Sequence, residues 1–456
     1  MKGNLGKRFA LLAGAALASS WLGVANANAD SLQDALLSAY RSNPILQSER
    51  ARQRATDELV PTAKSGWRPT IIAGGVAAQT WTDSDVASST SNQSLELNIE
   101  LAQPIFRGFK TVEGVKSAKA QVRAGQQQLV ATEQDVLLDA VTAYMDIIRD
   151  QNILALRNRN VGNLQKQVNA AQARFDAGEV TTTDVSQARA RLAAAQANVA
   201  SASANLNASK AAYVAVVGRN PGKLAGARAA KIPSSLKAAL ATAHEINPNI
   251  LASDALHDAS EHDVEVAKGD LLPEISLQAR AEKNFDPQPG VDRSESASIL
   301  GVVTVPIYQS GAEYSAVRIK KQTASQRQID IISATRGVRQ QVTTAWYVFA
   351  AAGDSIVSAK AQVAAAQKAL DGLNEEYKVG SRSTIDVLNA EEELLDARIN
   401  LASAERDQVV ASYQLLAAIG KLTARNLGLP GPYYDVEANY KAVKNKWIGL
   451  DAETVE

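Results

Sequence analysis

The sequence contains no cysteine among its 456 residues, so neither disulfides nor thiolate metal sites can hold the fold together. Aromatic residues make up only 5% of the chain, which is little for a large compact core and favours long helices packed through small residues. Only three histidines occur, and no Ser/His/Asp set, glycine-rich phosphate loop or pair of catalytic acids stands out. These absences argue against an enzyme, and against a cofactor or a metal site.

The first 29 residues are predicted to be a secretory signal peptide. Three basic residues precede an apolar run from 9 to 24, and small residues follow up to a cleavage site after Ala29 or Ala27. A membrane anchor is the alternative, but the run is shorter than the roughly 20 residues that a spanning helix needs. Farther along, no stretch of about 18 apolar residues predicts a transmembrane helix.

The charge of the chain is nearly balanced. Lys+Arg and Asp+Glu both number 48, so removal of the three basic residues of the signal peptide leaves a net charge of about −3. A slight negative charge gives no support for binding to nucleic acid, which calls for a basic surface.

The second half of the chain repeats the first half. Asn43-Pro44 returns as Asn247-Pro248, and Pro104-Ile105-Phe106 returns as Pro306-Ile307-Tyr308. An offset of about 200 residues is too long for a solenoid unit of roughly 20–50 residues, so the chain holds two copies of one large unit. We therefore divide it into the signal peptide (1–29), a first repeat (30–225), a second repeat (226–427) and a tail (428–456).

Each copy begins with two helices. Short helices are predicted over 32–42 and 236–246, and second helices run to about 65 and 269. Asn43 and Asn247 are suited to be N-caps, because each precedes a proline at the first position of the next helix. Pro61 is expected to bend the second helix of the first copy, since it removes a backbone hydrogen bond.

A β-hairpin is predicted next in each copy, about 68–104 and about 273–306. Its strands alternate apolar and polar residues, as in Leu95, Leu97, Ile99 and Leu101 with Glu96, Asn98 and Glu100 between them. Polar loops are expected at 82–94 and 284–297. Strands of this length with a long polar loop on one side are typical of outer-membrane barrels. A soluble hairpin packed on the helices is the alternative.

Long helical hairpins follow, about 108–219 and about 312–420. Each descending helix would be roughly 100 Å long, and Gly178 and Gly380 are placed to end these helices as left-handed caps. The return helices carry an alanine at every seventh residue, which lets two antiparallel helices approach closely. The alanines are Ala188, Ala195 and Ala202 in the first copy and Ala390, Ala397, Ala404 and Ala411 in the second.

The chain must assemble if its strands lie in a membrane. Four strands cannot close a barrel, and open strand edges are not tolerated in lipid. Three chains would supply twelve strands, whereas a dimer of eight would lack a usable lumen. The predicted fold class is mainly α with membrane β: an internally duplicated chain whose coiled-coil hairpins form a long α-helical barrel, with four strands per chain in a shared 12-stranded transmembrane β-barrel.

Over nearly all of the mature chain, this order of elements resembles the TolC-type outer-membrane efflux proteins. The resemblance is carried by the duplication and by two turn motifs, Gly178-Glu179-Val180-Thr181-Thr182-Thr183-Asp184-Val185 and Val379-Gly380-Ser381-Arg382-Ser383-Thr384-Ile385-Asp386-Val387-Leu388. It implies a homotrimeric tunnel in the outer membrane that extends into the periplasm. Such a tunnel is a passive exit duct for efflux or type I secretion. Its expected partners are outer-membrane lipid, a periplasmic adaptor and an inner-membrane transporter.

Two other functions remain open on the sequence. A periplasmic adaptor also carries long coiled-coil hairpins, but it has one hairpin flanked by lipoyl-like β domains, whereas this chain has two hairpins and two strand pairs. A structural coiled-coil spacer would not need strands with alternating faces.

The resemblance also assigns residues to a gate at the periplasmic mouth. Tyr377 and Arg382 match a pair that links the second hairpin to the first at Thr183 and Asp184. Asp386 matches an acidic ring that narrows the pore, and the second ring of the family is absent because Asn389 takes its place. The turns that meet the adaptor contain Gly178, Val180, Val379, Gly380 and Ser381.

Several of these assignments have an alternative explanation in local structure or solvation. Thr181-x-x-Asp184 and Ser383-x-x-Asp386 read as capping boxes, which alone could place both acids. An arginine in a polar turn such as Arg382 is usually a solvated charge. His257 and His262 stand five residues apart among acids, as on a solvated helix surface, so no metal is predicted there.

The tail after 428 breaks the helical pattern with prolines and offers Tyr440 and Trp447 as apolar anchors. The resemblance implies that it forms part of a belt around the middle of the tunnel.

Overall fold

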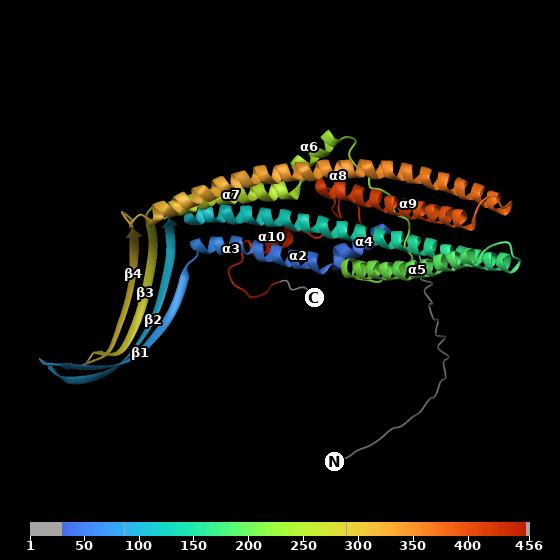
Figure 1. The fold of residues 1–456 in the computed structure, drawn as a ribbon. Coiled ribbons are helices and arrows are strands. Elements are labelled where there is room, and N and C mark those ends of the chain that lie inside the picture. The colour runs from blue at the N-terminus through green and yellow to red at the C-terminus, as the bar shows by residue number, and fades with distance from the viewer. Residues whose placement is uncertain (1–29, 86, 289, 453–456) are drawn as a thin grey trace, which may run out of the picture.

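The computed structural model describes residues 30–85, 87–288 and 290–452, so the predicted signal peptide lies outside the described residues. The predicted fold class is confirmed: the chain is mostly helical, with one four-stranded antiparallel sheet. Figure 1 shows the sheet at one end of an elongated helical body, and the turns of two helical hairpins at the other end. Within the described residues, no helix combines the length and the apolarity that crossing a membrane requires.

The order of elements occurs twice. The first copy consists of α1 (Leu32–Ser42), α2 (Pro44–Asp57), α3 (Leu59–Lys64), the 3-10 helix η1 (Ser65–Trp67), β1 (Thr70–Ser84), β2 (Ala87–Arg107), α4 (Lys110–Asp176) and α5 (Thr182–Val217). The second consists of α6 (Leu236–Ile246), α7 (Pro248–Gly269), β3 (Glu274–Gln288), β4 (Val291–Thr304), α8 (Ala312–Lys378) and α9 (Thr384–Ala418), and α10 (Ala438–Val443) lies in the tail.

The two copies differ where proline is present in only one of them. The second helix of the first copy is interrupted at Glu58, between α2 and α3, whereas α7 is continuous. Pro61 cannot donate to the carbonyl four residues before it, which is that of Asp57. The predicted bend is therefore confirmed as a break.

The predicted N-caps Asn43 and Asn247 also join helices end to end. Asn43 Oδ1 accepts the amide of Ile45 at 2.9 Å, and its Nδ2 donates to the carbonyl of Val216 at the end of α5, also at 2.9 Å. Asn247 likewise donates to the carbonyl of Ala418 at the end of α9, at 2.9 Å. The helical body therefore contains two columns made of helices joined end to end, α5 with α2 and α9 with α7. They lie beside the unbroken helices α4 and α8.

The sheet confirms the predicted alternation of faces. In the order β1-β2-β3-β4, Ile71 pairs with Leu101 and Ile99 with Ala281, on one face, while Glu100 pairs with Arg280 on the other. Near the helical body one face is thus mainly apolar and the other polar, as expected of a sheet between lipid and water. Towards the hairpin turns, Lys283 and Glu295 form an ion pair on the first face.

The predicted loops 82–94 and 284–297 were wrong, because most of their residues continue the strands. Thr80 pairs with Asn92, and Lys283 with Glu295, so the ladder extends close to the turn in both hairpins. Serine, threonine and asparagine make the same backbone hydrogen bonds as apolar residues, and threonine favours strands. Polarity alone therefore did not mark the ends of the strands.

The main core lies at the middle of the helical body. Short helices α1 and α6 cover α4 and α8 there, and Leu36, Leu137 and Val342 are among the side chains fully or almost fully buried. The hydroxyl of Tyr144 lies 2.7 Å from the carbonyl of Asp30 and 2.6 Å from that of Ala225, so it ties two extended segments to α4. The predicted alanine seams of the return helices are largely buried, as at Ala188, Ala195, Ala390 and Ala397.

Candidate gate at the helical hairpin tips

Both hairpin turns are closed by the predicted glycine caps. Gly178 and Gly380 have φ angles of 77° and 78°, in the left-handed region that favours glycine. The amide of Glu179 donates to the carbonyl of Arg174 at 2.8 Å, and the amide of Ser381 to that of Glu376 at 3.0 Å. These bonds complete the C-terminal caps of α4 and α8.

The turns project from the molecule, which suits them for contact with a partner. No heavy atom would lie within 4 Å of a Cβ added to Gly178 or Gly380. Val379 is 81% exposed, and Val180 is half-buried. Ser381 donates its hydroxyl proton back to the carbonyl of Glu376 at 2.8 Å, which fixes the second turn.

Asp184 and Asp386 form the predicted capping boxes. Asp184 Oδ2 accepts from the Thr181 hydroxyl at 2.7 Å and from the Thr181 amide at 3.0 Å. Asp386 Oδ2 accepts from the Ser383 hydroxyl at 2.7 Å and from the Ser383 amide at 3.1 Å. Because these bonds favour the ionised form, they lower the pKa of both carboxyl groups below its ordinary value. The capping explanation is confirmed, and the pore role of Asp386 stays a prediction.

Tyr377 reaches the first hairpin through its ring. Its hydroxyl lies 3.1 Å from the hydroxyl of Thr384, in its own hairpin. The guanidinium of Arg174, at the end of α4, lies over the ring at 4.4 Å from its centre. A cation–π contact of this kind contributes about 0.5–1 kcal/mol at an exposed site.

Arg382 closes its own turn. Its Nε donates to Glu376 Oε2 at 2.7 Å, and both side chains are half exposed. Among the hydrogen bonds and ion pairs of the described residues, Arg382 has no bond to Thr183 or Asp184. The implied link between these residues is thus not made within one chain, and it stays a prediction for contacts between chains.

Asn389 of the second hairpin is bonded to Arg191 of α5, in the first hairpin. Arg191 Nη2 donates to Asn389 Oδ1 at 2.9 Å, and the same guanidinium forms an ion pair with Glu392, one turn farther along α9. The sequence did not identify Arg191. Asn389 therefore does more than remove an acid from the pore, because its amide oxygen takes part in a bond between the hairpins.

A buried leucine and a largely buried acid complete the contact between α9 and the first hairpin. Leu388 is 2% exposed and packs against Leu164 of α4 and Ala195 of α5. Glu391 is largely buried beside the side-chain amide of Gln167 of α4, and among the described residues its Oε2 has no hydrogen-bond partner. We call the residues that join the two hairpins near the tips the latch: Gln167, Arg174, Arg191, Tyr377, Leu388, Asn389, Glu391 and Glu392.

Glu391 is expected to make the latch sensitive to pH. Burial raises the pKa of its carboxyl group above its ordinary value, because the latch excludes water from one oxygen. The closed latch therefore binds a proton more readily than an open one. Protonation of Glu391 thus stabilises the closed latch. This stabilisation is fully present below the ordinary carboxyl pKa and is lost as pH rises through the raised pKa.

Conductance of the purified channel, recorded in a bilayer between pH 7.5 and 5, is thus expected to fall on acidification. Glu391→Gln removes the buried charge, so it should lower conductance at neutral pH and flatten the profile. Glu393→Gln is the matched control on the same helix and should leave the profile unchanged. A profile that Glu391→Gln leaves intact would contradict this role.

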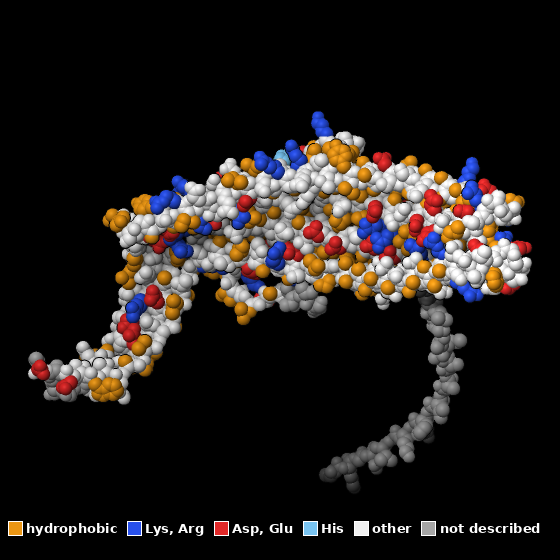
Figure 2. Space-filling model, in the orientation of Figure 1, with side chains coloured by type: hydrophobic (Ala, Val, Ile, Leu, Met, Phe, Trp, Pro, Cys, Tyr) orange, Lys and Arg blue, Asp and Glu red, His pale blue; other side chains and the backbone are white. Residues whose placement is uncertain are grey.

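A second set of charges joins the hairpins farther from the tips. Arg406 of α9 donates to Asp146 Oδ1 of α4 at 2.8 Å, and Arg149 pairs with Asp146 at 3.0 Å and with the buried Asp150 at 2.8 Å. Figure 2 shows acidic and basic side chains intermixed over the boundary of α4 and α9. The pair of Arg406 with Asp146 joins α9 to α4 between the latch and the central core, whereas the pairs of Arg149 lie within α4.

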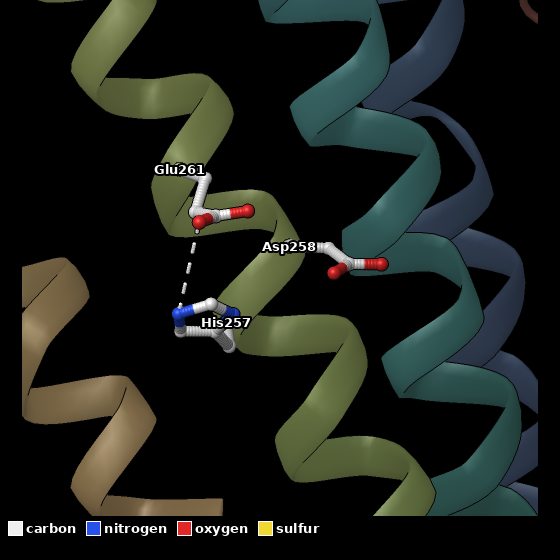
Figure 3. A group of neighbouring side chains, drawn as sticks. All are labelled: His257, Asp258 and Glu261. Carbon is white, nitrogen blue, oxygen red and sulfur yellow. Dashed lines mark ion pairs between the residues drawn. The ribbon is translucent and has the colours of Figure 1, made fainter.

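The histidines lie away from the tips, on α6 and α7. His262 Nδ1 lies 2.8 Å from Glu113 of α4. His257, Asp258 and Glu261 could offer three ligand atoms within 4.8 Å of one another, where the sequence predicts a solvated helix surface and no metal. Figure 3 shows His257 and Glu261 together on one side of α7, and Asp258 pointing towards α4. Asp258 forms an ion pair of 2.8 Å with Arg123, so it is already engaged as a contact between helices.

Comparison with known proteins agrees with the duplicated fold. A family model described as outer membrane efflux protein matches the chain twice, at residues 35–219 and 239–421. The chain is 40% identical over 424 residues to outer membrane efflux protein BepC of Brucella suis biovar 1, covering 92% of each chain. It is 25% identical to outer membrane protein TolC of Escherichia coli K12 over 88% of this chain and 84% of that one. The Campylobacter jejuni CmeC outer membrane channel superimposes with a TM-score of 0.77 at 16% identity, covering 91% of this chain and 89% of the other.

Proposed function

Because the chain belongs to the outer membrane efflux protein family and forms a channel of the outer membrane that extends into the periplasm, we propose that three copies assemble into one tunnel. Its strands would form a 12-stranded barrel in outer-membrane lipid, and its helices a tube of twelve columns. The tunnel serves as the passive exit duct of a tripartite efflux or type I secretion system, and its tips engage a periplasmic adaptor and an inner-membrane transporter.

The polar face of the sheet supports this duct. Glu96, Glu100 and Glu282 line that face with Arg280, which pairs with Glu96 and with Glu282, both at 3.2 Å. Four charged groups on one face would be costly in lipid but suit a water-filled lumen. The apolar face carries exposed side chains such as Ile299, at 76%.

The latch supports a gate at the opposite end. Its contacts join two hairpins that are each complete without it, because each hairpin has its own capping box and its own glycine cap. The hairpins can therefore separate without unfolding. We propose that the adaptor binds the exposed turns and draws the second hairpin away from the first, breaking the contacts of Arg174 and Arg191.

Asp386 lies beside the latch, at the start of α9, where three copies would form an acidic ring. Within one chain its capping bonds lower the pKa of the carboxyl group, so it stays ionised at neutral pH. Three converging carboxylates oppose that shift by mutual repulsion and attract cations. With Asn389 one turn away, the ring has one layer of charge.

Asp386→Asn is expected to reduce cation selectivity and to weaken block by divalent cations by about tenfold, since a ring of three charges supplies much of the binding. Asymmetric-salt reversal potentials and Mg²⁺ titrations of single channels measure both. Asp184→Asn is the matched control, because it removes an equivalent cap from the first hairpin. Unchanged selectivity in Asp386→Asn would reject the ring.

A further inference from the structure

The first part of the tail packs against the middle of the molecule, and the rest leaves it. Leu429 is 2% exposed within the central core, and the amide of Tyr434 donates to the hydroxyl of Tyr40 at 2.9 Å. This part agrees with the predicted belt. Beyond it, the tail runs along α2 and α3 towards the sheet, and the belt does not account for that course (Figure 1).

Four successive contacts trace this course. Asn439 donates to Asp57 Oδ2 at 2.8 Å, near the end of α2, and Tyr440 packs against the cluster of Val60 and α4. Lys64 Nζ then donates to the carbonyl of Lys444 at 2.9 Å and to Asn445 Oδ1 at 2.7 Å. Finally, the guanidinium of Arg68 lies 4.8 Å from the ring centre of Trp447. Each contact lies closer to β1, which begins at Thr70, so the tail approaches the start of the sheet at Trp447 before it loops back (Figure 1).

The tail presents large apolar side chains to solvent at this point. Trp447 is 65% exposed, and Ile448 and Leu450 are about fully exposed. Trp67, which precedes the first strand, is 47% exposed. Figure 2 shows hydrophobic side chains protruding beneath α3, where the tail loops. Tryptophan is enriched where a membrane meets water, because its ring is apolar and its N–H is polar.

Basic side chains surround this loop. Burial, and then the nearby charges of Lys119, Lys444 and Arg68, lower the pKa of Lys64. In the part of the chain that the structure describes, none of these four forms an ion pair, whereas nearby Lys446 pairs with Asp451 at 2.9 Å. We call Lys64, Arg68, Lys119 and Lys444 the basic foot. Positive charges that crowd one another without an acid are suited to an anionic partner.

We propose that the basic foot and the tail loop form a phospholipid-binding site at the periplasmic face of the outer membrane. The ammonium and guanidinium groups take the headgroup phosphate, and Trp447, Ile448 and Leu450 enter the boundary between headgroups and acyl chains. The position of this site relative to the membrane follows from the sheet, because its first strand starts two residues after Arg68.

This proposal rests on the outer-membrane placement of the sheet, and a test can separate the two. The chain has no cysteine, so a single nitroxide label can be placed at Ile448→Cys in the full-length protein, reconstituted in vesicles of phosphatidylcholine and phosphatidylglycerol at 3:1. Ile299→Cys on the apolar face of the sheet is the lipid control, and Glu179→Cys at the hairpin tip is the water control.

The label at Ile448→Cys is expected to be more accessible to oxygen than to a polar nickel chelate, at a depth of roughly 5–10 Å. A label that behaves like Glu179→Cys, or one shielded from both reagents by a neighbouring chain, would overturn the proposal. If Ile299→Cys also reports water, the membrane placement itself fails.

Charge is tested separately by the retention of phosphatidylglycerol. Arg68→Gln is expected to weaken retention about fivefold, the effect of one basic group near an anionic surface. Arg425→Gln is the matched control, since Arg425 lies over the ring of Tyr433 in the middle of the molecule, 5.6 Å from its centre. Equal retention by Arg68→Gln and the unmodified protein would show that the foot does not bind phosphate.

Discussion

Arg174→Ala combined with Arg191→Ala is expected to open the channel without its partners. These substitutions remove the cation–π contact to Tyr377 and the bonds to Asn389 and Glu392. Each of the two arginines contributes about 0.5–1 kcal/mol through these exposed contacts, so a chain loses about 1–2 kcal/mol. If three chains open together, the loss shifts the ratio of closed to open channels by about 100-fold or more.

Single-channel recordings in a planar bilayer measure this effect as a rise in the mean conductance. Arg189→Ala with Arg398→Ala is the matched control. These arginines lie on the same return helices, but they bond within their own hairpins, to Gln172 at 3.0 Å and to Gln367 at 2.7 Å. The control should remain as closed as the unmodified protein, and an equal rise in both variants would reject the latch.

Tyr377→Phe with Arg382→Ala provides a comparison, because the resemblance assigns the gate to these residues. Within one chain the Tyr377 hydroxyl and the Arg382 guanidinium contact Thr384 and Glu376, both in their own hairpin, and phenylalanine keeps the ring over which Arg174 lies. A large rise in conductance from this variant would therefore indicate contacts between chains. The two double variants together separate a latch inside each chain from one between chains.

Tyr144→Ala is expected to destabilise the protein most among single substitutions in the central core. The ring is fully buried, and its hydroxyl lies between two carbonyls. Loss of a buried aromatic side chain costs roughly 3–5 kcal/mol per chain. Tyr144→Phe should cost less, about 1–3 kcal/mol, because it removes the hydroxyl that donates to the carbonyl of Ala225, whereas the carbonyl of Asp30 still accepts from the amide of Ala225 at 3.0 Å.

The order of stability is measured by denaturant unfolding of the purified protein, followed by circular dichroism. Burial raises the pKa of Tyr144 to about 12, so the phenol is neutral at any pH used. Phe175→Ala is the control, since Phe175 is 41% exposed at the hairpin tip. If Tyr144→Ala were no less stable than Phe175→Ala, the core at the middle would not be what holds the fold together.

Much of the architecture could be predicted because its signals are local. The N-cap of Asn43 and the left-handed cap of Gly380 each depend on a few neighbouring residues, and periodicity identifies helices and strands. The strand ends were misplaced for the same reason: a polar run such as 87–94 has no local signal that separates ladder from loop. Its pairing depends on a partner strand elsewhere in the sequence.

The latch could be predicted only in part, because it is a contact between repeats. Arg174 is one of several arginines on α4, and nothing near it in the sequence indicates that it contacts Tyr377. Nothing near Arg191 in the sequence identifies Asn389 as its partner. Glu391 reads as one acid among several on α9, and only the packing of α4 against it shows that it is buried.

The side-chain amides of Asn43 and Asn247 have a mechanical consequence. In two of the four columns of each chain the helices that meet at the middle are not consecutive in sequence, and at each of these joints an asparagine side-chain amide bridges the helix ends. The continuous helices α4 and α8 therefore provide most of the bending stiffness across the middle, whereas the columns of α5 with α2 and of α9 with α7 can bend at their joints. A swing of the tips can be absorbed at these joints, so the periplasmic half can widen while the strands in the membrane keep their register.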